Sequence, residues 1–352
     1  MPSQEAKRDA ATRGYFPLVV VRRGGVVESV HHGAVAVVDD GGRTILAHGD
    51  PDAVTFLRSA AKPVQVLPLL LSGAVERFGL TEPEIAVMIG SHGGEAFHVE
   101  AVQSILKKIG LGEEALQCGS HAPYHRPAAR ALREAGQKPS AIHNNCSGKH
   151  AGMLALSVMV GAPTETYLDP EHPVQVRILE SLSALAGLPT SDILLAVDGC
   201  SAPTFALPLS AAATLYARLL SPERLPDTLA AAARRSVAAM RSRPDMVAGT
   251  DRICTALMRE GDGGLIAKIG AEGFYGLGYA RDGRGYGIAI KVADGDGDRA
   301  RSAAVIEVLR QLRLISDGKA DALFGRFVGE VRNYRGLPVG QVAPAFDLRP
   351  VA

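Results

Sequence analysis

The sequence predicts an α+β fold in which one antiparallel sheet is formed by both terminal regions of the chain. Residues 16–47 are rich in β-branched residues, and a turn signal at Asp39 to Gly42 indicates a hairpin. Residues 59–186 show mainly helical patterns, and residues 264–293 return to short apolar runs separated by Gly and Asp. Strands at both ends with helices between them indicate that the two ends complete one sheet around an inserted helical region.

Local signals predict the individual elements. Thr81 to Glu84 fit a capping box with proline near the helix start, so a helix begins there. Further elements are expected as helices over residues 95–109, 127–135, 149–160, 173–186 and 299–315, with Ala-rich helical sequence to about 241, and as strands over 193–197 and 204–209. Residues 241–249 are either a short linker or an active-site loop. The chain is expected to be one unit over 1–352, with sheet regions of about 16–58 and 260–345 and a helical region of about 59–259.

Composition favours a small-molecule partner. Thirty-eight Lys plus Arg against 37 Asp plus Glu leave a net charge of +1, so the chain has no field that would attract nucleic acid. The first 16 residues are polar and do not resemble a secretory signal, and the longest apolar segment, about 151–162, is shorter than the ~20 residues that a membrane span needs. We therefore expect a cytoplasmic protein that does not cross a membrane.

The first candidate for chemistry is the S-x-x-K spacing of Ser59 and Lys62, which follows Arg58. This spacing places a hydroxyl and an amine on one face of a helix. A lysine whose pKa is lowered can take the proton of a serine and so make it a nucleophile. Pro63 conflicts with the carbonyl four residues before it, so Ser59 is expected at a helix entrance. The spacing alone is common, and a surface Ser and Lys is the simpler interpretation.

The second candidate is the glycine-rich segment Gly90 to Glu95, which follows an apolar helix and contains Ser91 and His92. Small residues let backbone N–H groups approach a ligand, so this loop could hold an oxyanion or a carboxylate. An ordinary helix-terminating loop explains the pattern about as well.

Two further segments combine thiols with other polar groups. HNNCSGKH at 143–150 opens an apolar helix, whose N-terminus favours a thiolate or an anion. VDGCSAP at 197–203 ends an apolar run in an acid and a thiol. Cys146 and Cys200 with a His or Asp could bind Zn²⁺ with an open fourth position, although their separation in sequence does not show that they meet. A buried apolar role is the common alternative for any one cysteine.

A last candidate is Lys268 in GLIAKIG, a strand lysine within a K-x-G pattern. The order S-x-x-K, polar middle, then K-x-G on a late strand matches the arrangement in serine β-lactamases and penicillin-binding proteins.

Together, the segments RSAAKPVQ, GSHGGEAFH, HNNCSGKHAGML, VDGCSAPTFALPL and AKIGAEG resemble the rhizobial-type (class 3) L-asparaginases of the asparaginase II family. The five blocks match in order, and the resemblance extends from about residue 16 to about 345. It implies a single catalytic unit with a serine β-lactamase-like fold, a homodimer, and hydrolysis of L-asparagine to L-aspartate and ammonia.

The resemblance also implies roles for particular residues. Two Ser-Lys pairs fall on Ser59 with Lys62 and on Ser91 with Lys268. A Zn²⁺ site in which a lysine amine joins two thiolates falls on Cys146, Lys149 and Cys200. Four positions match neighbours of the substrate: Arg58, His92, His150 and Asp198. No S-x-N element is present where β-lactam enzymes carry one, which argues against β-lactam hydrolysis.

Three interpretations of the function remain open at this point. A serine acyl-enzyme activated by lysine, with zinc aiding substrate binding, is the preferred hypothesis. A zinc-bound water could instead attack the amide, with the serines only positioning the substrate. A non-catalytic amide-binding or penicillin-recognition-like module would bind asparagine and release no ammonia.

Overall fold

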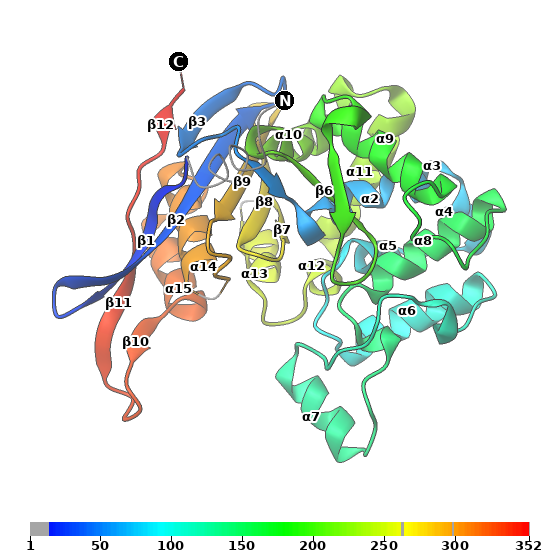
Figure 1. The fold of residues 1–352 in the computed structure, drawn as a ribbon, viewed down its shortest axis with the longest axis horizontal. Coiled ribbons are helices and arrows are strands. Elements are labelled where there is room, and N and C mark those ends of the chain that lie inside the picture. The colour runs from blue at the N-terminus through cyan, green and yellow to red at the C-terminus, as the bar shows by residue number, and fades with distance from the viewer. Residues whose placement is uncertain (1–13, 262–263, 298, 352) are drawn as a thin grey trace, which may run out of the picture.

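The structure, a computed structural model, describes residues 14–261, 264–297 and 299–351. Its main feature is an antiparallel sheet with the strand path β10-β11-β1-β2-β9-β8-β7, to which β3 adds on β2 and β12 adds on β3 (Figure 1). The strands are β1 (Phe16–Arg23), β2 (Val26–Asp39), β3 (Thr44–His48), β7 (Ile266–Ile269), β8 (Phe274–Arg281), β9 (Arg284–Val292), β10 (Glu330–Arg332), β11 (Pro338–Pro344) and β12 (Arg349–Pro350). The predicted α+β sheet formed by both terminal regions is confirmed.

Turn chemistry explains the pairing of the first strands. The hairpin predicted at Asp39 to Gly42 joins β2 to β3, and the Gly42 N–H donates to Asp39 O. A second hairpin, which the sequence analysis did not identify, joins β1 to β2 through Gly24 and Gly25. Their φ angles of 53° and 85° are the left-handed values that a two-residue hairpin turn requires.

Helices cover the sheet and form the inserted region. They are α2 (Lys62–Gln65), α3 (Leu67–Leu71), α4 (Ala74–Phe78), α5 (Glu82–Ile89), α6 (Ala96–Lys108), α7 (Arg126–Glu134), α8 (Ser147–Val160), α9 (Pro173–Ala186), α10 (Leu209–Leu220), α11 (Asp227–Ser242), α12 (Pro244–Val247), α13 (Ile253–Glu260), α14 (Ala300–Gln311) and α15 (Asp317–Phe327). The capping box predicted for α5 is present, since Glu84 accepts from the Thr81 N–H at 2.6 Å. No helix in the described ranges is long and apolar enough to cross a membrane.

Close packing joins the helical region to the sheet. Helix α10 packs against β2, β8 and β9, and α14 packs against β1, β9 and β11. A Cβ at Gly287 on β9 would lie 1.8 Å from Ala213 O of α10, so only glycine permits this approach.

A second, three-stranded sheet has the order β4-β6-β5, with β4 (Val54–Phe56), β5 (Leu194–Val197) and β6 (Pro203–Pro208). The strands predicted at 193–197 and 204–209 therefore pair with each other and with β4 rather than with the main sheet. This pairing brings the segment after β4 next to the loop between β5 and β6. Arg58 and Ser59 follow β4, and Asp198 and Cys200 lie in that loop.

Candidate active site

A strained turn carries Ser59. The chain enters the short 3₁₀ helix η1 (Arg58–Ala61) with Arg58 at φ 51°, a left-handed value that costs a non-glycine residue energy. The Arg58 guanidinium compensates by holding Asp198 Oδ1, with Nε at 2.9 Å and a terminal nitrogen at 2.7 Å. Burial opposes the Asp198 charge, but Lys149 and Arg58 lower its pKa. Ser59, which is half-buried, is thereby presented at the helix entrance that the sequence predicts.

The Lys62 amine forms a hydrogen bond with Ser91. Lys62 is fully buried on α2, and its Nζ donates to Ser91 Oγ at 3.2 Å, to Cys146 Sγ at 3.2 Å and to Gly90 O. These bonds use the three donors of an ammonium. Within the described ranges, no hydrogen bond joins the Lys62 amine to the Ser59 hydroxyl. The S-x-x-K pair shares one turn, but its lysine bonds the serine of the second candidate loop.

Ser91 and Lys268 are in direct contact. Lys268 Nζ lies 2.7 Å from Ser91 Oγ and 3.0 Å from Ile269 O. Burial, followed by the neighbouring charge of Lys62, lowers the pKa of Lys268 well below its usual value. A neutral Lys268 amine can accept the Ser91 hydroxyl proton while Ser91 Oγ accepts from Lys62. The three side chains therefore form a continuous path for a proton.

The strand β7 brings Lys268 to this position. It is the edge strand of the main sheet, and it packs against η1. A Cβ at Gly270, just after β7, would lie 2.6 Å from Leu57 O, so the glycine of the K-x-G pattern allows the two backbones to touch.

A pair of buried thiols lies beside the lysines. Cys146 is at the start of α8, and the Lys149 amine one turn later lies 2.9 Å from Cys200 Sγ. A hydrogen bond from the Cys200 thiol, with Lys62 and Lys149 nearby, lowers the pKa of Cys146 well below its usual value, and the same hydrogen bond and burial raise the pKa of Cys200. Burial opposes the charge of Lys149, but Cys200, Cys146 and Asp198 together raise its pKa.

These groups suit a thiophilic metal. Cys146 and Lys149 lie at the start of α8, and Cys200 lies in the loop between β5 and β6, but the three side chains converge. Cys146 also favours the thiolate form that binds Zn²⁺. The Lys149 amine would have to lose a proton to join them. Among the residues described, no group of three His, Cys, Asp or Glu side chains could hold a metal by itself, so the lysine is essential to such a site.

The two predicted histidines differ in their contacts. His92 is fully buried, and burial and the nearby His98 lower its pKa well below its usual value. Its Nδ1 accepts from the Gly94 N–H at 3.2 Å. Its Nε2 lies 2.9 Å from the Ser147 hydroxyl, which itself donates to Ile142 O. Both ring nitrogens are engaged, so His92 braces the Ser91 loop and has no atom left for substrate.

His150 is buried one turn into α8. Its Nδ1 lies 2.7 Å from the Tyr167 hydroxyl, which accepts from the Gln117 N–H. The described structure provides no hydrogen-bond partner for the other ring nitrogen, Nε2. Burial and Lys149 lower the pKa of His150 well below its usual value.

Residues outside the predicted candidates hold the Ser91 loop in place. The Ser91 N–H donates to Val247 O at 2.8 Å. The Glu95 carboxylate accepts from the Thr250 hydroxyl at 2.6 Å and from the Thr250 N–H at 2.9 Å. Through these contacts the segment predicted as a linker or an active-site loop packs against the Ser91 loop, and it is partly helical, because α11 ends at Ser242 and α12 spans Pro244–Val247. Only the turn composition of that segment signals this role in the sequence.

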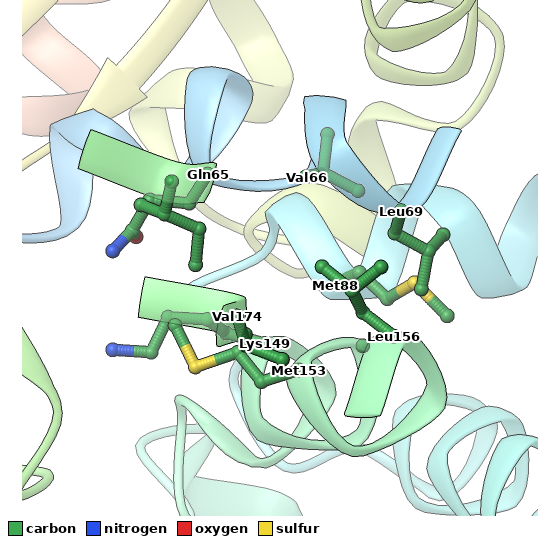
Figure 2. Close-up of a pocket in the computed structure, with 10 residues that line it drawn as sticks. Gln65, Val66, Leu69, Met88, Lys149, Met153, Leu156 and Val174 are labelled. Atoms are coloured by element: carbon green, nitrogen blue, oxygen red, sulfur yellow. The ribbon is translucent and has the colours of Figure 1, made fainter. Parts of the chain in front are cut away.

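A small cavity of about 10 Å³ lies between α2, α3, α8 and α9, and its volume is close to the space that one water molecule needs (Figure 2). Apolar side chains form most of its wall, and Gln65 and Lys149 are the polar residues that line it.

Comparisons with known proteins identify the family of the chain. The family profile described as L-asparaginase II matches residues 19–344. The curated proteins give no match. Among solved structures, the chain is similar to Mglu in its glutamate form, with 17% identity, a TM-score of 0.42, and coverage of 80% of this chain and 61% of that one.

Two other solved structures are similar over most of their length. A β-lactamase from Mycobacterium bovis shares 12% identity at a TM-score of 0.41, covering 80% of this chain and 95% of that one. A Bacillus glutaminase shares 14% identity at a TM-score of 0.40, covering 88% of this chain and 96% of that one.

Proposed function

Since this chain belongs to the L-asparaginase II family and is therefore an amidohydrolase, we propose that it hydrolyses L-asparagine to L-aspartate and ammonia through a serine acyl-enzyme. The observation that carries the serine mechanism is the path Lys62–Ser91–Lys268. It joins a hydroxyl to two buried amines, one of which has a strongly lowered pKa. Such a lysine can act as a general base near neutral pH.

Ser59 is the proposed nucleophile. Lys62 first passes a proton to Ser91 while Ser91 passes its own to neutral Lys268, which leaves the Lys62 amine uncharged. Lys62 shares a helix face with Ser59 and then takes its proton as Ser59 Oγ attacks the side-chain amide carbon. The C–N bond breaks, ammonia leaves with the transferred proton, and water hydrolyses the acyl-enzyme to L-aspartate.

The backbone around the two serines supports this assignment. In the described ranges no hydrogen bond uses the Ser59 N–H, so it is available to stabilise an oxyanion. The Ser91 N–H is already engaged by Val247 O at 2.8 Å. Ser59 is also more accessible than Ser91, which is 5% exposed. Ser91 is therefore better suited to pass protons than to attack.

Zinc is proposed as an aid to substrate binding, held by Cys146, Lys149 and Cys200. When bound, it would supply a Lewis acid weakened by two thiolate ligands, which suits orienting a substrate more than activating water. Arg58 and Asp198 support the turn that presents Ser59, and Asp198 also faces Lys149. On the family resemblance alone, we further propose a cytoplasmic homodimer.

Ammonia release by the purified chain tests the proposal. We expect release from L-asparagine, assayed in parallel with L-glutamine and with or without added Zn²⁺. Removal of zinc by a chelator should raise KM and leave kcat within a few fold, whereas a zinc-bound water mechanism requires kcat to collapse. Binding of asparagine with no ammonia from either amide would replace the enzyme by the amide-binding module.

A further inference from the structure

Tyr216 is a buried tyrosine of α10 whose hydroxyl the mechanism above does not use. Its side chain is 1% exposed, and the hydroxyl donates to Ala60 O at 2.7 Å. Burial raises the pKa of Tyr216 well above its usual value, so the hydroxyl stays a donor near neutral pH. Ala60 directly follows Ser59 in η1. The hydrogen bond from Tyr216 therefore holds the turn that carries the proposed nucleophile.

The sequence of η1 leaves the Ala60 carbonyl without the backbone donor that a 3₁₀ helix would give it. In such a helix each carbonyl accepts from the N–H three residues later. For Ser59 this donor is the Lys62 N–H. For Ala60 the residue at that position is Pro63, which has no N–H. Tyr216 supplies a donor in its place, although it lies 156 positions later in the chain.

Tyr216 reaches η1 across the main sheet. A Cβ at Gly276 on β8 would overlap the Tyr216 ring, so only glycine leaves room for the ring at this point. Gly276 lies directly opposite Lys268 in the register of β7 and β8. Opposed positions of an antiparallel pair share one face, so Tyr216 packs on the face of the sheet from which the Lys268 side chain extends. One side chain therefore contacts both the turn of Ser59 and the strand position opposite Lys268.

We propose that Tyr216 is a positioning residue that holds Ser59 in place relative to the path Lys62–Ser91–Lys268. The inference rests on the proposed function, because it takes Ser59 as the nucleophile. Without the Tyr216 hydroxyl, the carbonyl that follows Ser59 loses a buried partner, and the peptide group of the turn can rotate. Such a rotation redirects Ser59 Oγ. Because attack requires close alignment of the reacting atoms, it slows acylation more than it weakens substrate binding.

The test replaces Tyr216 by Phe, which removes the hydroxyl and keeps the ring. We expect kcat for ammonia release from L-asparagine to fall about 10- to 100-fold and KM to stay within about threefold, because the lost alignment matters only in the transition state. Ser221→Ala is the matched control. Ser221 caps the same helix, is fully buried, and accepts from the Gly285 N–H at 2.7 Å. This variant should show a similar fall in Tm and an unchanged kcat.

A serine-directed probe reports the reactivity of Ser59 without the amide substrate. The Oγ of an activated serine displaces fluoride from the phosphorus of a small fluorophosphonate, and mass analysis of peptides identifies the labelled serine. We expect the labelling of Ser59 to slow in Tyr216→Phe by about the same factor as kcat. In Ser221→Ala the labelling rate should match that of the wild type.

The two measurements separate the possible failures. Unchanged kcat and labelling in Tyr216→Phe, with a fall in Tm like that of Ser221→Ala, would make Tyr216 a structural residue and leave the proposed function intact. Absence of ammonia release by the wild type would contradict the proposed function, and the labelling rates would still test Tyr216. No labelling of Ser59 in the wild type, or labelling of Ser91 in its place, would overturn the inference, because the turn that Tyr216 holds would then not carry the nucleophile.

Discussion

Three lysines of the candidate site are buried. Lys62 and Lys268 are fully buried, and Lys149 is 4% exposed. An isolated buried ammonium is strongly unfavourable, so such groups either find anionic partners or lose their proton. Lys149 has the thiols as partners, which raise its pKa. Lys268 has no such partner, and burial lowers its pKa so that it can lose its proton. These environments separate the roles of the two lysines. Without a metal the Lys149 amine stays charged beside the thiols, whereas Lys268 can act as a base beside Ser91.

Replacing Lys268 by Met should therefore stabilise the protein and inactivate it. We expect a gain of about 1–2 kcal/mol in the free energy of unfolding near neutral pH, because a desolvated amine is replaced by an apolar chain. The folded pKa of Lys268 lies below the unfolded value, so the unfolded wild type binds more protons between those two values, and wild-type stability rises with pH across that window. Urea denaturation at several pH values should show that this rise is absent from the variant.

The two serines should respond differently to removal of their hydroxyls. Ser59→Ala is expected to abolish ammonia release with little change in Tm, because its hydroxyl makes no hydrogen bond within the described ranges. Ser91→Ala interrupts the path between Lys62 and Lys268, so we expect kcat to fall about 10²- to 10⁴-fold, as for loss of acid-base catalysis. An acyl-enzyme trapped on Ser91, or substantial activity in Ser59→Ala, would transfer the nucleophile role to Ser91.

At the scale of elements, the site depends on η1 lying directly against the edge strand β7. The Leu57 N–H donates to Phe205 O of β6 at 3.0 Å, and Gly270 allows Leu57 O to approach the chain after β7. The turn that carries Ser59 is therefore held between the two sheets. Small shifts of either sheet would move Ser59 relative to Ser91 and Lys268.

Gly270→Ala should test this arrangement. The added methyl would meet Leu57 O at 2.6 Å, so η1 and β7 must separate. We expect a loss of roughly 1–3 kcal/mol in stability from overpacking, and a fall of about 10²-fold in kcat because the reacting groups are displaced. Gly318→Ala on α15 is the control, since its methyl would contact nothing within 4 Å. Unchanged kcat in Gly270→Ala would show that this contact does not position Ser59.

The helices, strands and turns could be predicted from the sequence more fully than the contacts between them. Local signals in the sequence were sufficient for the Asp39 to Gly42 hairpin and for the capping box of α5, because turns and caps depend on a few adjacent residues. The bond from Lys62 to Ser91 could not be predicted, because it depends on how α2 packs against the end of α5. The same holds for Val247 and Thr250, whose contacts with the Ser91 loop join segments that are distant in the chain.

At the scale of the whole molecule, the thiol pair connects the helical region with the small sheet. Cys146 opens a helix of the inserted region, whereas Cys200 lies between two strands of the small sheet. A metal held by both, with Lys149, would tie these regions together in the folded state only. Binding to the folded state alone raises stability by mass action, by about 2.7 kcal/mol when free ligand is 100 times its Kd.

Zinc should accordingly raise the Tm of the wild type in a concentration-dependent way. Cys200→Ser should lose most of this shift, because two of the three protein ligands cannot hold the metal as three do. Cys254→Ala is the control, since Cys254 is a buried thiol whose partner is the Tyr275 hydroxyl at 3.1 Å. An equal zinc shift in all three proteins would place the metal elsewhere and leave Cys146, Lys149 and Cys200 as an ion-paired thiol cluster. A shift lost in Cys200→Ser alone assigns the metal to the junction between the helical region and the small sheet.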